Sequence, residues 1–225
     1  MPKLLWDEAT TKLYETGTDR GVLYKQNKLG NYGEGIAWNG LIGVSQSPEG
    51  AEPKKLFANN KKYLTLRSAE EFKGSIKAFT YPEEFNECDG SKTLAPGVYL
   101  GQQNRVPFGL VYRTLIGNDT EGTDYGYRLH IIYGASVKPS SREFESVNDD
   151  PTAIEFSWDF ETTPQDVNIE GVAPTAYLSV DSTQVSKTVL KALEDKLYGN
   201  ESDEATLPDL ETLIGLLTAE TPDGE

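Results

Sequence analysis

A long predicted β-hairpin constrains the fold of this chain more than any other feature. Residues 102–134 contain two runs of alternating apolar and polar side chains, Phe108–Ile116 and Tyr125–Tyr133, which flank the polar segment Gly117–Gly122. An alternation with a period of two is typical of β-strands, and a polar, glycine-containing segment between two such runs predicts a turn. The sequence therefore predicts a long antiparallel hairpin with few groups that could perform chemistry.

Further segments have strand character, and Ile154–Thr162 alternates most strictly. We expect one face of this strand to be buried and the other to be in water, because period-two patterning with this contrast is typical of a half-buried strand. The buried face would carry Ile154, Phe156, Trp158 and Phe160, and the wet face Glu155, Ser157, Asp159 and Glu161. Other strands are predicted at Gly21–Lys25, Ile36–Val44, Lys62–Leu66, Ser75–Tyr81 and Thr175–Val180.

The hydrophobic period changes from two to that of a helix after Asp181. The pattern predicts a helix over Ser186–Tyr198 that stops at Gly199, and a second short helix that Pro208 opens at a first-turn position. Ser68 and Glu71 have the spacing of a capping box and predict a single helical turn. Many strands with a few helices indicate a mostly β sandwich or barrel, organised as one domain with a core in residues 1–182 and a helical segment in residues 183–225.

Several segments are predicted to lack regular structure, among them Pro82–Pro96, which carries the turn signal Cys88-Asp89-Gly90. Residues 1–35 contain many glycines and polar residues and are expected to form an arm with one short strand. Ser45–Asn60 is a long polar segment with Pro48 and Pro53, and we expect it to be a mobile loop. Loops of this length inside a compact domain are often functional.

The chain offers little for catalysis. It has one His, one Cys and one Met, and neither a G-x-S-x-G nor an HExxH motif is present. We expect His130 and Cys88 to be structural, and one His with one Cys is too few for a zinc site of the His type. Carboxylates such as Glu83 and Glu84, or Glu155 and Asp159, could serve a glycosidase in principle, but a solvated surface is the favoured interpretation. No enzyme activity, cofactor or metal is predicted.

The formal net charge of −15, from 21 basic and 36 acidic residues, argues against tight binding to nucleic acid. It favours a soluble surface, or a wall along which DNA slides without sticking. No apolar run is long enough for a transmembrane helix, and the first residues lack the apolar core of a secretion signal, so no membrane association or secretion is expected.

Several segments together resemble the major tail proteins of siphophages that infect Gram-positive bacteria, which form the tube of long, non-contractile tails. The resemblance extends from about Ile36 to Asp209 and is carried by the set rather than by any one piece. The main segments are EEFNECDGS at 83–91, LAPGVYLGQQNRVPFGLVYRTLIGNDTEG at 94–122, YGYRLHIIYGA at 125–135, NDDPTAIEFSWDFETTP at 148–164 and PTAYLSVDS at 174–182. The same pattern includes AWNGLIGVSQSPEG at 37–50, KYLTLRSAEEF at 62–72, AFTYPEEF at 78–85, LEDKLYG at 193–199 and LPD at 207–209.

The resemblance implies a tail-tube-type β-barrel or sandwich with one flanking helix, a long stacking loop and extended terminal arms. Subunits would form rings of six that stack into a tube in the virion tail, assembled in the host cytoplasm. Implied partners are further copies of the chain, a tape measure protein, and tail terminator and distal tail proteins. Phage DNA would pass through the lumen without specific binding. The stacking loop would include Ser47, Pro48, Glu49, Glu52 and Pro53, and the acids lining the lumen or the wet face would include Glu155, Asp159 and Glu161.

Two alternatives remain open at this point. One is a receptor-binding or carbohydrate-binding β-sandwich module of a phage, and the other is a carbohydrate-active enzyme with a β-sandwich fold. The absence of a reactive set of side chains argues against the enzyme. The extent of the resemblance argues against the isolated binding module.

Overall fold

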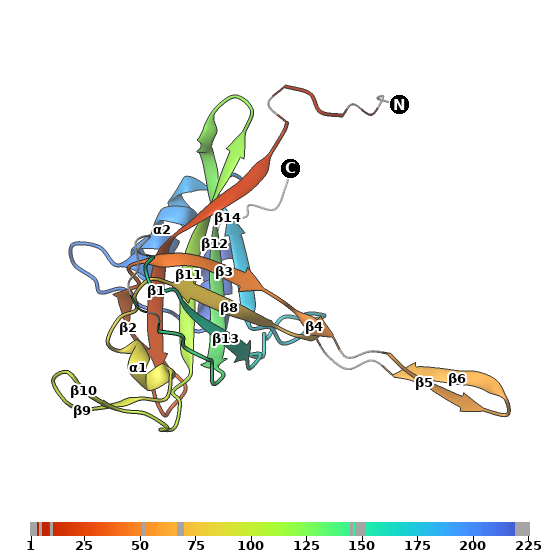
Figure 1. Ribbon diagram of the computed structural model, residues 1–225. Coiled ribbons are helices and arrows are strands. Elements are labelled where there is room, and N and C mark those ends of the chain that lie inside the picture. The colour runs from red at the N-terminus through yellow and green to blue at the C-terminus, as the bar shows by residue number, and fades with distance from the viewer. Residues whose placement is uncertain are drawn as a thin grey trace.

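The computed structural model describes residues 4, 6–9, 11–50, 53–66, 70–144, 146 and 152–218. Within these ranges the chain is mostly β, with an 8-stranded antiparallel sheet, separate two-stranded ribbons and short helices (Figure 1). The prediction of a mostly β, sandwich-like fold is therefore confirmed.

The main sheet has the strand order β2-β1-β11-β12-β13-β8-β3, and β14 pairs with β12 beside this path. Its strands are β1 (Tyr14–Gln26), β2 (Tyr32–Ala37), β3 (Leu41–Gln46), β8 (Lys73–Ala78), β11 (Phe108–Asn118), β12 (Gly122–Val137), β13 (Phe156–Thr162) and β14 (Tyr177–Asp181). The two-stranded ribbons pair β4 (Glu49–Gly50) with β7 (Glu70–Glu71), β5 (Lys54–Ala58) with β6 (Lys61–Leu66), and β9 (Lys92–Ala95) with β10 (Val98–Leu100).

The predicted hairpin is confirmed as β11 and β12, which pair from Phe108↔Ala135 to Asn118↔Gly122. Its turn is closed by the side chain of Asn118, whose Oδ1 accepts hydrogen bonds from the amides of Thr120 (3.0 Å) and Glu121 (2.5 Å). Gly122 has a φ of +61°, a conformation that favours glycine.

Strand β12 divides the sheet into two layers. Its residues Arg128–Ile132 pair with β14, whereas Ala135–Val137 pair with β13. The change of partner occurs at Gly134, which has a φ of +58° and lies so close to Thr163 that a Cβ atom would be 2.8 Å from the Thr163 carbonyl oxygen. From β13 the sheet continues through β8 to β3, and β3 returns to contact β1.

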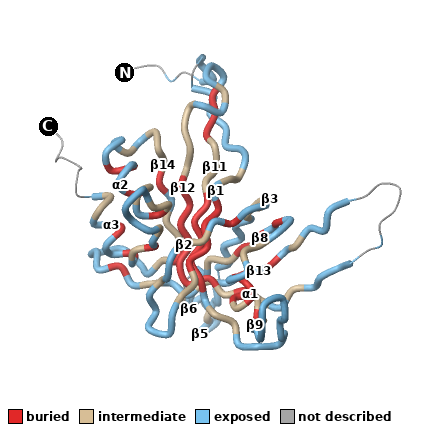
Figure 2. Tube along the Cα trace, turned by 90° about the vertical axis from the view of Figure 1, so that its left-hand side faces the viewer, coloured by how far each residue is buried: buried red, intermediate tan, exposed pale blue. Residues whose placement is uncertain are grey.

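The central strands are buried on both faces, as Figure 2 shows for β1, β11 and β12. One cluster packs beneath the helices and the other fills the space between the two layers. In β1, Val22 and Tyr24 belong to the first cluster, whereas Leu23 belongs to the second. This burial explains why the apolar runs in these strands are nearly continuous, because neither face needs polar residues.

Helix α2 (Lys187–Tyr198) begins at Ser186, whose Oγ accepts a hydrogen bond from the Val189 amide (3.3 Å), and ends at Gly199 with a φ of +75°. Both bounds match the prediction. Helix α3 (Leu210–Thr218) begins after Asp209, whose Oδ1 accepts from the Thr212 amide at 2.8 Å. Pro208 therefore precedes the cap, and its prediction as a first-turn residue was wrong.

Other local predictions were wrong where a turn signal was overlooked. Ile36–Val44 is two strands, because Gly40, with a φ of +73°, turns the chain between β2 and β3. The region predicted as the loop Pro82–Pro96 contains α1 (Phe85–Cys88) and β9.

The ends of two predicted elements also differ from the structure. The first strand spans Tyr14–Gln26 rather than Gly21–Lys25. Ser68, the expected helix cap, lies outside the described residues, and its partner Glu71 belongs to the strand β7.

The inward face predicted for Ile154–Thr162 is correct for two of its four members. Trp158 and Phe160 are fully buried, and Phe156 is partly buried. Ile154 is 43% exposed, because β13 begins only at Phe156 and Ile154 has no partner strand to place it over the core.

Candidate assembly surfaces

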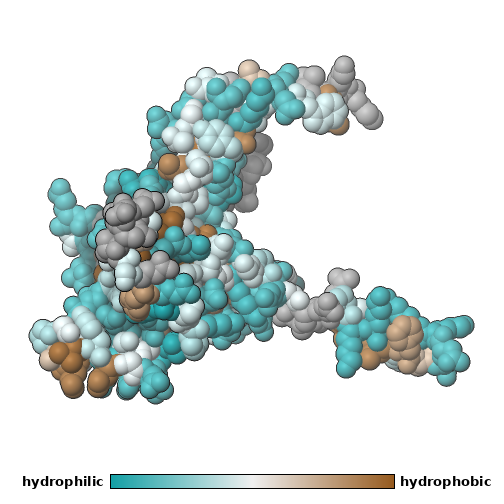
Figure 3. All heavy atoms as spheres, in the orientation of Figure 1, coloured by the Kyte–Doolittle hydropathy of each residue, from teal (hydrophilic) through white to brown (hydrophobic). Residues whose placement is uncertain are grey.

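The hairpin formed by β5 and β6 projects from the body of the molecule (Figure 1). None of its residues belongs to either hydrophobic core. It nevertheless carries two aromatic side chains, Phe57, which is 69% exposed, and Tyr63, which is 73% exposed. Figure 3 shows hydrophobic atoms among hydrophilic ones on this projection. A two-stranded hairpin alone is marginally stable in water, so one with exposed aromatic rings is suited to packing against another molecule.

The charge of this hairpin is opposite to that of the chain as a whole. Lys54–Leu66 contains four lysines and no Asp or Glu, in a protein with a net charge of −15. Within the described part of the chain, none of these lysines forms an ion pair. The hairpin therefore presents unpaired positive charge beside its exposed aromatic rings.

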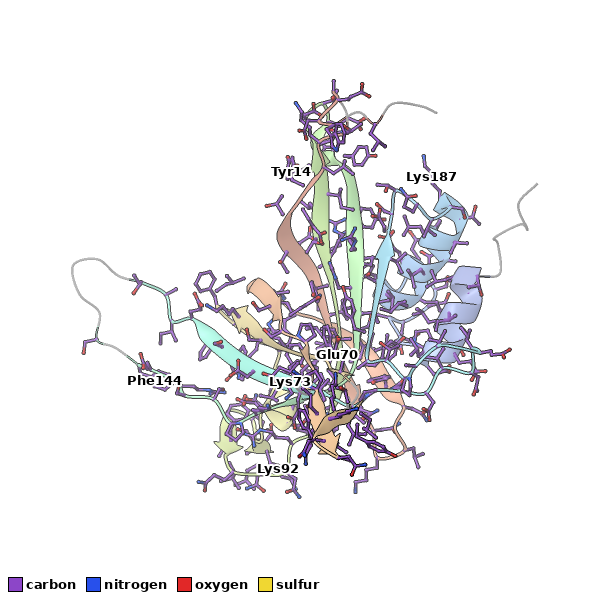
Figure 4. The ribbon with its side chains drawn as sticks, turned by 90° about the vertical axis from the view of Figure 1, so that its right-hand side faces the viewer. Tyr14, Glu70, Lys73, Lys92, Phe144 and Lys187 are labelled. Carbon is purple, nitrogen blue, oxygen red and sulfur yellow. The ribbon has the colours of Figure 1, made fainter. Side chains whose placement is uncertain are left out.

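The stalk of the hairpin, residues 47–50, 53 and 70–73, includes β4, β7 and Lys73. Figure 4 labels Glu70 and Lys73 in this part of the molecule. Lys73 Nζ lies 2.9 Å from Glu49 Oε2 and 3.0 Å from Glu71 Oε2, and its carbonyl oxygen accepts a hydrogen bond from the Ser47 amide at 2.7 Å. The hydrogen bond and charge of Lys73 lower the pKa of Glu49. These contacts join the strand that enters the hairpin to the strand that leaves it.

The expectation of an irregular loop over Ser45–Asn60 is overturned. This segment contains the end of β3, the short strand β4 and all of β5. The sequence did not reveal this because β4 and β5 become strands only through their partners β7 and β6, which follow later in the chain.

The predicted stacking residues lie in the stalk rather than in the projecting hairpin. Ser47 and Glu49 are bound to Lys73, Pro48 and Pro53 are exposed, and Glu52 lies outside the described residues. The charged and aromatic hairpin residues 54–66 were missed as a site, although the run of lysines without acids was a signal available in the sequence.

The acids predicted on the wet face are all exposed, and two of them are paired with lysines. Glu155 Oε1 lies 3.1 Å from Lys77 Nζ, and Glu161 Oε2 lies 3.1 Å from Lys138 Nζ. Asp159 lies opposite Ser75 across the β13–β8 pair. This face therefore carries both acidic and basic side chains, and its position along a lumen stays a prediction.

A second two-stranded ribbon, β9–β10, also presents apolar side chains to solvent. Leu94 is 69% exposed, and Val98, Tyr99 and Leu100 are each more than 40% exposed. Sequence reasoning assigned this region to a loop and a turn, so this surface was missed as well. It adds a second apolar patch that is separate from the hairpin β5–β6.

His130 lies in a buried polar cluster between the layers. Its Nε2 is 2.8 Å from Thr114 Oγ1 and 3.4 Å from Glu15 Oε1, and its Nδ1 is 2.7 Å from the Tyr177 hydroxyl. Burial lowers the pKa of His130, an effect that Glu15 opposes. The ring also stacks on Tyr112, with centroids 4.6 Å apart. These contacts place the His130 ring in the hydrogen bonding and packing between the strands.

The described residues offer little for a metal site, a reactive thiol or a membrane-spanning helix. The described residues contain no group of three or more His, Cys, Asp or Glu side chains placed to hold a metal ion. Burial raises the pKa of the Cys88 thiol to about 12, so the reactive thiolate is scarce at neutral pH. In the same ranges, no helix combines the length and apolar character needed to span a membrane.

Comparison with known proteins adds no assignment, since the chain matches no protein-family model and no curated protein.

Proposed function

We propose that this chain is a self-assembling structural protein, the major tail protein that forms stacked hexameric rings in the tail tube of a siphophage. The proposal rests on the resemblance of residues 36–209 to that family and on the surfaces described above. The observation that carries it is the hairpin β5–β6, an arm with exposed aromatic rings that contributes nothing to either core.

An arm of this kind supports assembly rather than ligand binding. The hairpin is joined to the body through a stalk that is fastened by Lys73, so it is presented at a defined root while its rings remain free to contact another copy. Burying an aromatic side chain removes a large apolar area from water. A contact between this arm and a different patch on the next copy is heterologous, and such contacts close into rings or continue as filaments.

The proposal extends to the role of the tube. Stacked rings would enclose a lumen through which phage DNA passes during infection, with a tape measure protein setting the length and terminator and distal tail proteins at the ends. The net charge of −15 supports a wall with weak attraction for phosphate. Glu155, Asp159 and Glu161 are the acids that we propose for the lumen or the outer wet face.

Sedimentation velocity of the purified chain tests this function. We expect the wild type to sediment as rings or larger assemblies as its concentration rises. A variant in which Lys54–Leu66 is replaced by a short Gly-Ser linker should remain small. It should keep its circular dichroism spectrum, because the hairpin packs in neither core. A wild type that stays monomeric at all concentrations and binds cells or a carbohydrate would instead support the binding module.

A further inference from the structure

The face of the hairpin β5–β6 that carries Phe57 also carries positive charge. Lys62 lies directly opposite Phe57 on β6, and residues paired across two strands share one face. Lys55 lies two residues before Phe57 on β5, with a register shift of the pairing between Leu56 and Phe57. Phe57 is therefore an exposed aromatic ring flanked by two lysines.

A hollow of about 230 Å³ lies between α3 and residues 167–169, which are far from the hairpin in the sequence. Its apolar lining includes Val167, Ile169 and Ile214, and Ile169 is 45% exposed. Glu211 also lines it, with Oε2 held by the Asn168 side-chain amide at 3.2 Å. The hollow thus combines apolar walls, suited to an aromatic ring, with a carboxylate.

The chain segments that line this hollow are acidic. Residues 162–186 and 199–218, which contribute all of its lining, contain no Lys or Arg. Asp166 and Glu170 flank the lining residues in the chain, and both are exposed. The hairpin is therefore basic, whereas the two chain segments that line the hollow are acidic and lack Lys and Arg.

We propose that Phe57 of one copy inserts into the α3 hollow of a second copy, with Lys55 and Lys62 beside Glu211 and its acidic neighbours. This inference rests on the proposed function and names the contact through which copies would assemble. Interface anchors of this kind are aromatic side chains in a pocket, and complementary charges around them select the partner and the register. Because the ring and the hollow are different patches of one chain, each copy can give one contact and receive another.

Cysteine cross-linking tests the proposed pair directly. We suggest the double variant Ala58→Cys/Gly215→Cys, which keeps the Phe57 ring because the first thiol is placed on its exposed neighbour. Gly215 lines the hollow, and a Cβ atom there meets no heavy atom within 4 Å. Under mild oxidation the double variant should give a covalent ladder beyond the dimer on a non-reducing gel. Each single variant should give a dimer at most. The native Cys88 is buried and should not contribute.

A matched control pairs Ala58→Cys with Leu94→Cys, which places the second thiol on another exposed apolar patch. This variant should assemble but form no ladder. If the wild type and the Gly215 double variant both assemble and no ladder appears, the inference is wrong while the proposed function stands. If the wild type does not assemble, the proposed function fails and the inference fails with it.

Charge reversal gives an independent readout. Lys62→Glu and Glu211→Lys should each reduce assembly, and their combination in one chain should recover it. Glu201→Lys is the control, because Glu201 is an exposed acid on the same base-free segment that does not line this hollow. Equal losses from Glu201→Lys and Glu211→Lys, without recovery in the combined variant, would overturn the proposed pairing.

Discussion

The ammonium group of Lys73 lies 2.9 Å from a carboxylate oxygen of Glu49, and this ion pair fastens the two strands at the root of the projecting hairpin. The Ser47 amide donates to the carbonyl of the same lysine, so charge and backbone contacts coincide at one residue. A change in pH that protonates Glu49 would therefore weaken the contacts between these two strands.

We predict that acidification loosens this root. Lys73 lowers the pKa of Glu49, so the stabilisation is present above the carboxyl pKa of the unfolded chain and is lost as the pH falls through the lower folded pKa. Protection of the Ser47 amide against hydrogen exchange, corrected for intrinsic rates, should fall over that range. Glu49→Gln should remove this pH dependence, and Glu70→Gln, which alters an exposed acid of the neighbouring strand, should retain it.

Trp158→Ala should destabilise the fold by about 3–5 kcal/mol, the usual range for truncating a fully buried large aromatic residue. Trp158 has no exposed surface and its ring packs near Trp38, Tyr81 and Phe85. Urea unfolding measures the change, and Trp158→Phe, which keeps an aromatic ring, should cost less. A loss below about 1 kcal/mol for the alanine variant would contradict the burial of this strand face.

Core residues could be predicted from the sequence where a strand shows apolar–polar alternation within its own residues. Trp158 and Phe160 were placed correctly because the alternation around them is local, and α2 was placed correctly because Ser186 and Gly199 mark its ends. Strand β6 was predicted as Lys62–Leu66, but its pairing with β5 was not, because β5 is defined by its partner strand rather than by a core face. The hollow at α3 could not be predicted either, since residues 167–169 and α3 are distant in the chain and meet only in the fold.

The only histidine provides a second pH-dependent observable. Burial lowers the pKa of His130, so we expect its ring to titrate below the usual value of about 6.5. Because the unfolded chain then binds the proton more readily, stability is complete above the unfolded pKa and declines as the pH falls through the folded one.

NMR of the His130 ring measures this pKa without ambiguity, because the chain has one His. The neighbouring groups that influence it are Glu15, which raises the pKa, and Arg128, which lowers it. Glu15→Gln should therefore lower the ring's pKa further. A ring that titrates above the usual value would contradict the buried, neutral state.

We predict that the protein shows no measurable binding to duplex DNA at roughly physiological salt, where charges are screened beyond about 8 Å. The lysines of the hairpin are outweighed by a net charge of −15, and each phosphate contact would need a cation to neutralise it. Fluorescence anisotropy with a labelled duplex measures this. A micromolar affinity that weakens steeply with added salt would mean that the hairpin contacts nucleic acid. The proposal that DNA passes through the lumen without binding would then have to be withdrawn.

Negative-stain electron microscopy of the purified wild-type chain tests self-assembly most directly. The account predicts rings of uniform diameter that stack into hollow tubes as the concentration rises. It also predicts that these particles are absent when Lys54–Leu66 is replaced by the Gly-Ser linker. Dispersed single copies of the wild type at every concentration, or tubes that form equally well without the hairpin, would contradict it.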